Sequence, residues 1–342
     1  MGGSAARRRL GRISCALVSS VVLSSLLFVA APRAQEKLSV KLEFLPYGMH
    51  APFYLAVEKG WFKQAGLDVS IEDGNGSAPA IQLVGAGKYD IAEVDLGAMI
   101  MARDNGVPVK AIAGILRRSD IGALVAANSN IHTPKDLEGK TVYYSPNSVE
   151  SLFIDSFFKK TGVDKAKVKL ISIDLSAKVS TYLSGNGDAM FSLVPLYTID
   201  KLPRHSRGIL FADYGIQVPG FGLIANDDDI QHRQKALAAF VSVFQRSWNA
   251  IRYGNEKDEA VAALIKERPQ AKLNPVTMKE QIESVIPFMD TPATKGKPTL
   301  WQSKSDWEST IKGLEAVKAI KPGSKPEDYY TNAFVPDTSA SR

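Results

Sequence analysis

The chain has 342 residues, of which 45% are hydrophobic and 23% are charged, with 42 basic and 36 acidic side chains. The basic excess lies in residues 1–34, which hold five arginines and no acid, so 37 basic and 36 acidic side chains remain in the rest. This balance gives no support for binding to nucleic acid or to an anionic membrane. The single cysteine, Cys15, also lies in residues 1–34, which excludes a disulfide, a thiolate nucleophile and a cysteine-bound metal elsewhere.

Residues 1–34 have the pattern of a secretory signal peptide. A basic run from Arg7 to Arg12 precedes an apolar stretch over 13–31, and small residues that suit cleavage follow, including Ala31 and Ala34. We therefore expect an exported, periplasmic protein that begins between residues 31 and 36 once the leader is cleaved. A retained membrane anchor is the alternative, because the apolar stretch approaches the length that spans a bilayer. The sequence leaves general and twin-arginine export both open.

Residues 38–77 contain the first complete structural unit. Residues 38–44 and 67–71 alternate apolar with polar side chains, the period of a β-strand, and residues 51–62 between them have the apolar pattern of a helix. This unit is typical of a doubly wound α/β sheet, whose ligands lie at the carboxyl ends of the strands. We expect ligand contacts in two loops there, the ring-rich 47–50 and the glycine loop 73–77 with its exposed backbone amides.

The sequence then repeats this organisation. Gly87 stands three residues before Asp90 at the start of an apolar run, and Gly185 stands three residues before Asp188 in the same way. A strand pattern and a helix pattern precede each pair at similar distances. The echo predicts two lobes of like topology, each strand–helix–strand–helix–strand, although α/β domains in general share such features.

Apolar stretches connect the two lobes. Residues 121–127 are expected to form the first crossover, and residues 221–225 to return the chain to lobe one. Helical patterns follow at 231–253, 258–266, 276–289 and 303–319, and we expect their tryptophans to pack inside: Trp248, Trp301 and Trp307. The predicted domains are lobe one over 35–123 and 221–335, lobe two over 124–220, and a flexible tail over 336–342.

No motif for catalysis is present. The sequence has no nucleophile elbow, no His-Glu-x-x-His and no phosphate-binding lysine loop. Of the four histidines, only His50 has aromatic neighbours, and the others have polar neighbours typical of a surface: His132, His205 and His232. We therefore predict no catalytic residue, no metal and no cofactor, and for His50 either a ligand contact or a role in fixing its loop.

Several runs resemble a known family. They are residues 50–56 (HAPFYLA), 58–62 (EKGWF), 66–69 (GLDV) and 133–140 (TPKDLEGK). Over residues 38–264 the chain resembles periplasmic solute-binding proteins of the nitrate/sulfonate/taurine class, closest to the subgroup that includes thiamine-pyrimidine-precursor binders. The resemblance implies an α/β, two-lobed periplasmic-binding-protein fold of type II. Each lobe would be a doubly wound, mostly parallel sheet, with the ligand cleft between the lobes.

The resemblance also implies a function. The protein would be an exported, high-affinity receptor that captures a small organic solute, either heterocyclic or aromatic, or a sulfonate or carboxylate. It would deliver this solute to the permease of an ABC-type importer, as a monomer that touches the membrane only through the permease. The alternatives are an enzyme on the same fold, for pyrimidine-precursor synthesis or a lyase-like reaction, and a sensor ectodomain.

Ligand contacts implied by the resemblance lie in loops of both lobes. Lobe one supplies Tyr47, His50, Phe53, Asn75, Gly76, Ser77, Glu93 and Asp95, and lobe two supplies Ser145, Asn147, Ser148, Phe191 and Ser192, with Phe221 at the returning crossover.

The chemistry of these residues leaves the charge of the solute open. Ser145 and Ser148 open a helix whose free amides suit an anion or a carbonyl oxygen. Glu93 or Asp95, if either faces the cleft, would instead bind an amine, an amidine or a ring N–H. The alternatives are that Asp95 caps a helix and that Glu93 is a solvated loop acid or part of a hinge salt bridge. The pair Arg117-Arg118 could bind a carboxylate or a sulfonate, but adjacent arginines are more often at the surface.

Overall fold

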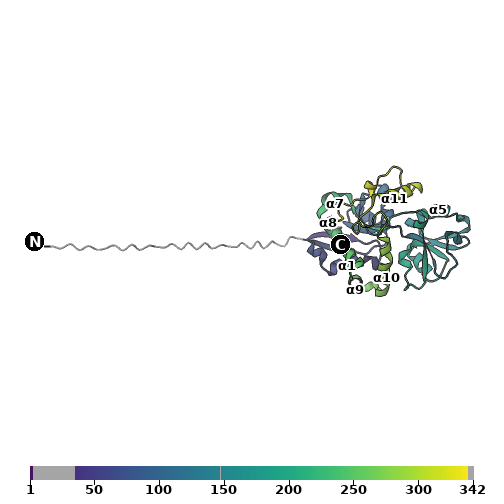
Figure 1. Cartoon of the computed structure of the whole chain (residues 1–342), viewed down its shortest axis with the longest axis horizontal. Coiled ribbons are helices and arrows are strands. Elements are labelled where there is room, and N and C mark those ends of the chain that lie inside the picture. Colours follow the sequence, from purple (N-terminus) through teal and green to yellow (C-terminus); the bar gives the residue numbers. More distant parts are fainter. Residues whose placement is uncertain (3–34, 147, 338–342) are drawn as a thin grey trace. The chain divides into compact units, whose positions relative to one another are not determined.

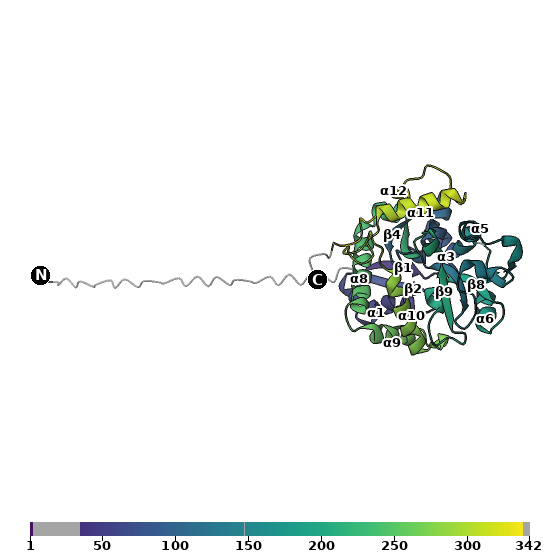
Figure 2. The ribbon, with the colours of Figure 1, turned by 45° about the vertical axis from the view of Figure 1, so that its right-hand side comes forward.

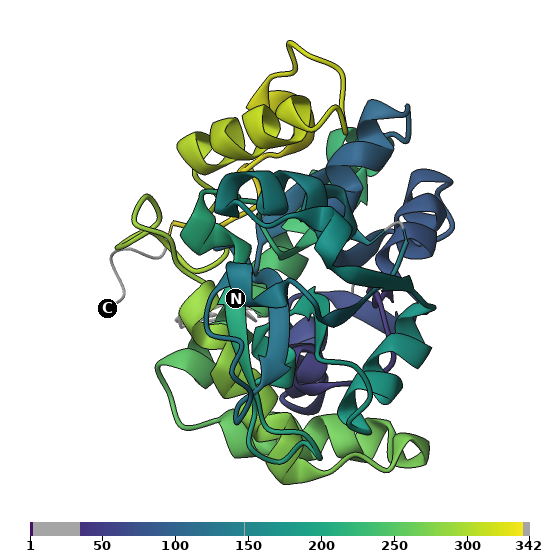
Figure 3. The ribbon, with the colours of Figure 1, turned by 90° about the vertical axis from the view of Figure 1, so that its right-hand side faces the viewer.

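The computed structural model describes residues 1–2, 35–146 and 148–337. Figures 1, 2 and 3 show the chain from three sides. The predicted signal peptide lies almost entirely outside the described residues, as do most of the predicted tail and Asn147. In the described part of the chain no helix combines the length and the apolar character needed to cross a membrane.

The first sheet has five strands in the order β2-β1-β3-β10-β4. The strands are β1 (Glu36–Lys41), β2 (Leu67–Glu72), β3 (Ile91–Asp95), β4 (Val109–Gly114) and β10 (Phe221–Asn226). β1 pairs in parallel with β2 and β3, whereas β10 pairs antiparallel with β3 and β4. The sheet is therefore parallel except for β10. As predicted, residues 221–225 return the chain from the other sheet to this one.

The second sheet repeats this arrangement in the order β7-β6-β8-β5-β9. The strands are β5 (Ile121–Ala126), β6 (Thr141–Tyr144), β7 (Lys169–Ser172), β8 (Ala189–Leu193) and β9 (Ser206–Leu210). Here β5 is the reversed strand, antiparallel to β8 and β9. Residues 121–126, expected as a crossover, thus form a strand of the second sheet, and the chain changes sheets just before it.

Helices flank both sheets. They are α1 (Ala51–Glu58), α2 (Trp61–Gln64), α3 (Ser77–Gly85), α4 (Leu96–Asp104), α5 (Val149–Thr161), α6 (Leu175–Leu183), α7 (Asp227–His232), α8 (Gln234–Arg252), α9 (Lys257–Glu267), α10 (Pro275–Val285), α11 (Lys304–Ala316) and α12 (Pro326–Tyr329). α1, α8, α9 and α10 pack together beside the first sheet, and α11 and α12 lie at its β4 edge (Figure 2). We call the second sheet with α5 and α6 lobe two, and the first sheet with the other helices lobe one.

The structure divides the helix expected over 51–62. It ends at Glu58 and a short second helix begins at Trp61, because Gly60 adopts the left-handed conformation at φ 65°. The C-terminal helices appear as predicted, with Trp248 and Trp307 buried between them, whereas Trp301 is only half-buried.

The echoed acids have the same structural role in the two lobes. Asp90 Oδ2 accepts the Ser39 amide at 2.6 Å, and Asp188 Oδ2 accepts the Thr141 amide at 2.8 Å. Each acid therefore anchors the first parallel strand of its own sheet, Asp90 near the middle of β1 and Asp188 at the first residue of β6. The glycines before them, at φ 66° and 93°, each lie just past the end of a helix, so the repeated motif is a helix stop followed by a strand anchor.

Candidate functional site

The first wall of the candidate site is the segment between β1 and α1. Tyr47 precedes a single 3-10 turn, η1 (Gly48–His50), that runs directly into α1. Gly48 packs on α10 so closely that a Cβ atom would lie 2.3 Å from the Met278 carbonyl oxygen, and its amide donates to Gln281 Oε1 at 2.9 Å. These contacts fix the loop on α10, with Tyr47 and His50 both buried.

His50 lies between two carboxylates. Its Nε2 is 3.0 Å from Glu93 Oε2 and 4.0 Å from Glu43 Oε1, and both His50 and Glu93 are fully buried. The Tyr47 and His50 rings are 4.2 Å apart and inclined by 56°. Neither His50 nitrogen is aligned for a hydrogen bond within the described protein, so the short distance to Glu93 reflects charge and packing rather than a directed bond.

Burial dominates the electrostatics of this wall. Loss of water raises the pKa of Glu43 to about 8; His50 partly offsets this shift, and Glu93 and Asp95 increase it. Burial also raises the pKa of Tyr47 well above its ordinary value, and the carboxylates Glu43 and Glu93 raise it further. The wall therefore favours protonated carboxyl groups, or a neighbour that supplies hydrogen-bond donors.

Asp95 combines a structural bond with a buried carboxyl group. It ends β3 and is the N-cap of α4, where its Oδ1 accepts the Ala98 amide at 2.8 Å, so the helix-cap interpretation is confirmed. Its own amide donates to Ser77 Oγ at 3.0 Å. Burial raises the pKa of Asp95 well above its ordinary value despite the Ala98 bond, and Asp120 and Glu150 raise it further. Its carboxyl group is therefore close enough to lobe two to interact with acids there.

The second wall lies in lobe two at the carboxyl ends of β6 and β8. Ser145 follows β6, and its carbonyl accepts both the amide and the hydroxyl of Ser148, the N-cap of α5. Ser192 lies buried near the end of β8, in register with the start of β5. Because β5 runs against β8, the residues just before β5, Ser119 and Asp120, reach this same edge.

A buried ion pair stands behind the second wall. Glu150 lies in the first turn of α5, and Lys178 of α6 donates to its Oε1 at 2.8 Å and to the Phe191 carbonyl at 2.8 Å. The Lys178 side chain is fully buried. Glu150 in turn interacts electrostatically with Asp95, Asp120 and Tyr197. Lys178 therefore neutralises one acid of a region that is otherwise acidic.

Buried polar atoms without a hydrogen-bond partner in the described protein gather on the two walls. On the walls they are Tyr47 Oη, both ring nitrogens of His50, both carboxylate oxygens of Glu93 and of Asp120, Ser119 Oγ and Ser145 Oγ. Others lie elsewhere in lobe one, on Tyr54, Trp248, Asn249, Arg252, Glu256 and Gln302. Native proteins pair most buried polar atoms, since leaving one unpaired costs about 1–3 kcal/mol. Their concentration on the two walls makes these walls the candidate ligand site.

Two of the predicted aromatic contacts lie in the cores of the lobes instead. The Phe53 ring is 4.3 Å from that of Phe244, inside lobe one, because the turn of α1 carries it to the face that packs on α8. Phe191 packs against Phe157 and Phe211 inside lobe two, on the face of β8 opposite to Ser192. Neither ring is brought to the acidic walls.

The glycine loop is less open than expected. The amides of Gly74 and Gly76 donate to the carbonyls of Phe44 and Glu43 at 3.1 and 2.5 Å, so these amides bind the neighbouring segment of the chain. Asn75 is exposed at the tip, and Ser77 is engaged with Asp95. Of the other predicted contacts, Phe221 is buried in register with Asp95, and Asn147 lies outside the described residues.

Sequence reasoning missed four charged residues of this region: Glu43, Asp120, Glu150 and Lys178. Glu43 had a usable signal, since it lies at the carboxyl end of the strand pattern over 38–44. Asp120 directly precedes a strand and Glu150 lies in the first turn of a helix, and acids at such positions are most often solvated. Nothing in the sequence around Lys178 marks it as buried.

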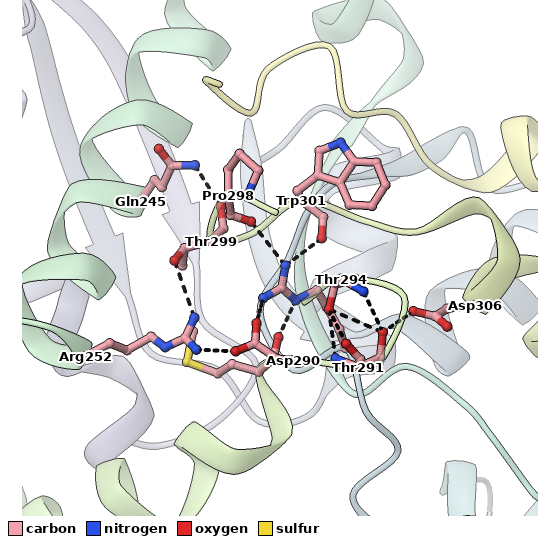
Figure 4. A network of polar contacts seen from close by, with 11 residues as sticks. Gln245, Arg252, Asp290, Thr291, Thr294, Pro298, Thr299, Trp301 and Asp306 are labelled. Carbon is pink, nitrogen blue, oxygen red and sulfur yellow. Dashed lines mark hydrogen bonds and ion pairs between the residues drawn. The ribbon is translucent and has the colours of Figure 1, made fainter. Parts of the chain in front are cut away.

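The arginine pair is divided between the interior and the surface. Arg117, expected at the surface, is 7% exposed, and its guanidinium donates to the carbonyls of Met289, Pro298 and Trp301 and to Asp290. Figure 4 shows this network, in which Asp290 also accepts from Arg252 at 2.5 Å. Arg118 is half-buried, and its guanidinium lies 3.6 Å from the Asp213 carboxylate. Arg117 thus anchors the first crossover to the C-terminal segments of lobe one and is fully engaged there.

The remaining histidines are exposed, as predicted: His132, His205 and His232. Among the residues that the structure describes, no group of three or more His, Cys, Asp or Glu is arranged to hold a metal ion.

The two like sheets, their adjoining crossovers and the polar walls between them define the two-lobed fold of the periplasmic binding proteins. The structure is similar to that of the periplasmic aliphatic sulphonate binding protein SsuA from Escherichia coli, with a TM-score of 0.66 and 14% sequence identity, over 86% of this chain and 91% of that one. Identity this low establishes the fold alone.

Residues 48–256 match the family described as NMT1/THI5 like, and the chain belongs to this family. It is 26% identical over 308 residues to a protein of Halalkalibacterium halodurans named formylaminopyrimidine-binding protein, covering 87% of this chain and 91% of the relative. It is also 22% identical over 326 residues to a Legionella pneumophila protein named 4-amino-5-hydroxymethyl-2-methylpyrimidine phosphate synthase, covering 92% of this chain and 96% of that relative.

Proposed function

We propose that this protein is an exported solute-binding receptor of an ABC-type importer and that its solute is a small nitrogen heterocycle rich in hydrogen-bond donors. The receptor captures the solute between its lobes in the periplasm, as a monomer, and presents it to the membrane permease. It binds the solute without turning it over.

The observation that carries this proposal is the buried acidic region between the lobes. Glu43, Glu93 and Asp95 stand together on the first wall, and both oxygens of Glu93 are without a partner. Amine or ring N–H groups would supply the missing donors, because a charge-assisted hydrogen bond is stronger than a neutral one. A sulfonate or a nitrate would place a negative charge beside Glu43 and Asp95, whose pKa values burial already raises because it disfavours negative charge there.

Aromatic side chains fit the same class of solute. The Tyr47 and His50 rings lie together on the first wall and offer a flat face beside the carboxylates. Ser145, Ser148 and Ser192 provide small hydroxyl groups on the second wall. We assign the contacts to Tyr47, His50, Glu93 and Asp95 of lobe one and to these three serines of lobe two. The pyrimidine in the name of the Halalkalibacterium relative is a solute of this chemistry.

An enzyme is the second candidate, because the Legionella relative carries the name of a synthase. Residues 35–342 contain no cysteine, so a thiolate nucleophile or thiolate metal ligand is absent from this part of the chain. His50 and Glu93 are close enough for proton transfer. In catalysis such a group is usually oriented by a further residue, and within the described part of the chain neither His50 nitrogen has a hydrogen bond that would do so.

Calorimetry on the exported protein tests the proposal. The titrants are a formylaminopyrimidine, an alkanesulfonate and nitrate, and each mixture is then analysed by mass spectrometry. We expect the pyrimidine to bind and to be recovered unchanged, with about 2.7 kcal/mol of added stability at a hundredfold excess over its dissociation constant. Tight binding of the sulfonate or of nitrate with no binding of the heterocycle would reject the proposed solute. Conversion of the pyrimidine would favour the enzyme.

A further inference from the structure

The segment that joins the two sheets carries a carboxylate that the protein does not pair. Asp120 ends the first crossover, is 1% exposed, and has no hydrogen-bond partner for either carboxylate oxygen in the described part of the chain. Its backbone is held, because its carbonyl accepts the Val194 amide at 2.8 Å. The fold therefore fixes the position of this side chain without giving its charge a partner.

The carboxylate packs against the second crossover at a glycine. A Cβ atom on Gly220 would lie 3.0 Å from Asp120 Oδ1. The Gly220 amide donates to the Leu116 carbonyl, and its carbonyl accepts the Leu96 amide, each at 2.9 Å. Both crossovers and the start of α4 meet at this point, so Asp120 stands where the two lobes join.

Acidic groups surround Asp120. Glu150 raises its pKa, and Asp120 and Glu150 together raise the pKa of Asp95. Burial is the largest cause and raises the pKa of Asp120 to about 7, although the residue's own backbone partly offsets this shift. The neighbourhood contributes repulsion and desolvation, both of which oppose an unpaired carboxylate here.

The cations of the adjoining segments are engaged elsewhere. Lys178 binds Glu150 and the Phe191 carbonyl. Arg117, in the same crossover, binds Asp290 and backbone carbonyls of lobe one. Among the described residues of these segments no cation is left to compensate Asp120, so a bound solute can supply the donor.

We propose that Asp120 is a ligand contact at the hinge, where its carboxylate binds an N–H or cationic group of the solute and selects solutes that carry one. The inference rests on the function proposed above and adds a specificity-determining residue to that site. A closed receptor that holds no such solute buries an unpaired carboxylate, whereas a donor-bearing solute pairs it, so the solute favours closure through Asp120.

A pair of probes that differ by one group tests this assignment. They are 4-amino-2-methylpyrimidine and 2,4-dimethylpyrimidine, in which a methyl group replaces the exocyclic amine. Their affinities are measured by calorimetry on the wild type, on Asp120→Asn and on the control Asp229→Asn. Asp229 is a buried acid of α7 that is fully engaged, with Asn226 at 2.7 Å and Arg233 at 3.5 Å.

We expect the wild type to prefer the amine by about 10- to 100-fold, the range for a hydrogen bond to a charged group. Asp120→Asn should lose most of this preference by binding the amine more weakly, while Asp229→Asn keeps it. If Asp120→Asn does not fold, Asp120→Ser takes its place with the same expectation.

A folded Asp120 variant with the preference of the wild type would overturn the role of Asp120 and leave the proposed function intact. A wild type that binds neither these probes nor a formylaminopyrimidine would overturn the proposed function, and this inference with it. The two failures are therefore distinguishable.

Discussion

The Lys201 amide donates to Glu280 Oε2 at 3.0 Å, and this bond joins the loop after β8 in lobe two to α10 in lobe one. The same two regions pack together through the short turn η4 (Pro195–Tyr197), whose Tyr197 interacts with both Glu43 and Glu150. The contact joins the lobes at a point other than the two crossovers, which meet at Asp120 and Gly220. We interpret it as a latch that favours the closed arrangement.

Removing the latch should open the ligand-free protein. Glu280→Ala deletes a partly exposed hydrogen bond of about 0.5–1.5 kcal/mol, so the ratio of open to closed molecules should rise about two- to tenfold. Small-angle X-ray scattering should show a larger radius of gyration, which a tight ligand restores.

The control for this experiment is Glu283→Ala. Glu283 lies on the same helix, but its partner is Lys257 at 2.6 Å, also in lobe one. Equal radii for Glu280→Ala and the wild type would show that this bond does not govern closure.

Tyr47 and Phe53 should respond in opposite ways to truncation, although both belong to the loop and helix that follow β1. Tyr47→Ala removes a ring beside His50 and the carboxylates, and we expect it to weaken ligand binding at least about tenfold with the fold intact. Phe53→Ala leaves a cavity against Phe244 and should lower the stability by about 3–5 kcal/mol. The affinity of folded Phe53→Ala should stay that of the wild type.

Calorimetry and denaturant unfolding on both variants separate these effects. Normal affinity in Tyr47→Ala, together with lost affinity in folded Phe53→Ala, would show that the ligand binds on the side of Phe53 and not on the side of Tyr47.

Breaking the Glu150–Lys178 pair should destabilise the protein strongly. Lys178→Met leaves Glu150 buried without its cation, and the expected loss is about 3–5 kcal/mol in denaturant unfolding. Adding Glu150→Gln removes the unpaired charge, so the double variant should recover part of this loss. A single variant as stable as the wild type would mean that water reaches Glu150 in the native state.

The acidic region should make the ligand-free protein more stable at pH 5 than at pH 8. Folding raises the pKa of Glu43 from 4.5 to about 8 and that of Asp120 from 3.8 to about 7. As the pH rises, the unfolded chain releases these protons first, which favours unfolding. The contribution is complete below about pH 4 and is lost by about pH 8.

Thermal unfolding across this range measures the effect. Glu43→Gln, which cannot titrate, should flatten the curve. A slope that Glu43→Gln leaves unchanged would assign the pH dependence to other groups.

The sequence by itself determined the elements and their repetition, because these depend on local rules. Alternation and apolar period marked the strands and helices, and the glycine and acid of each echo acted as a helix stop and a strand anchor in the structure. These effects need only a few neighbouring residues. Where a local rule was overlooked, as at Gly60, the predicted helix was divided.

The candidate site was decided by the tertiary structure. Whether an acid is solvated or buried depends on what the other lobe places against it, so the surroundings of Asp120 and Glu150 could not be inferred from their own segments. Arg117 was expected at the surface, but its partners lie in a segment more than 170 residues later in the chain. Phe53 and Tyr47 look alike as aromatic residues of one loop and helix, and only the packing of α1 on α8 separates the core residue from the one that faces the charges. Local patterns set which residues can form an element, whereas burial and charge at a site arise from contacts between distant segments.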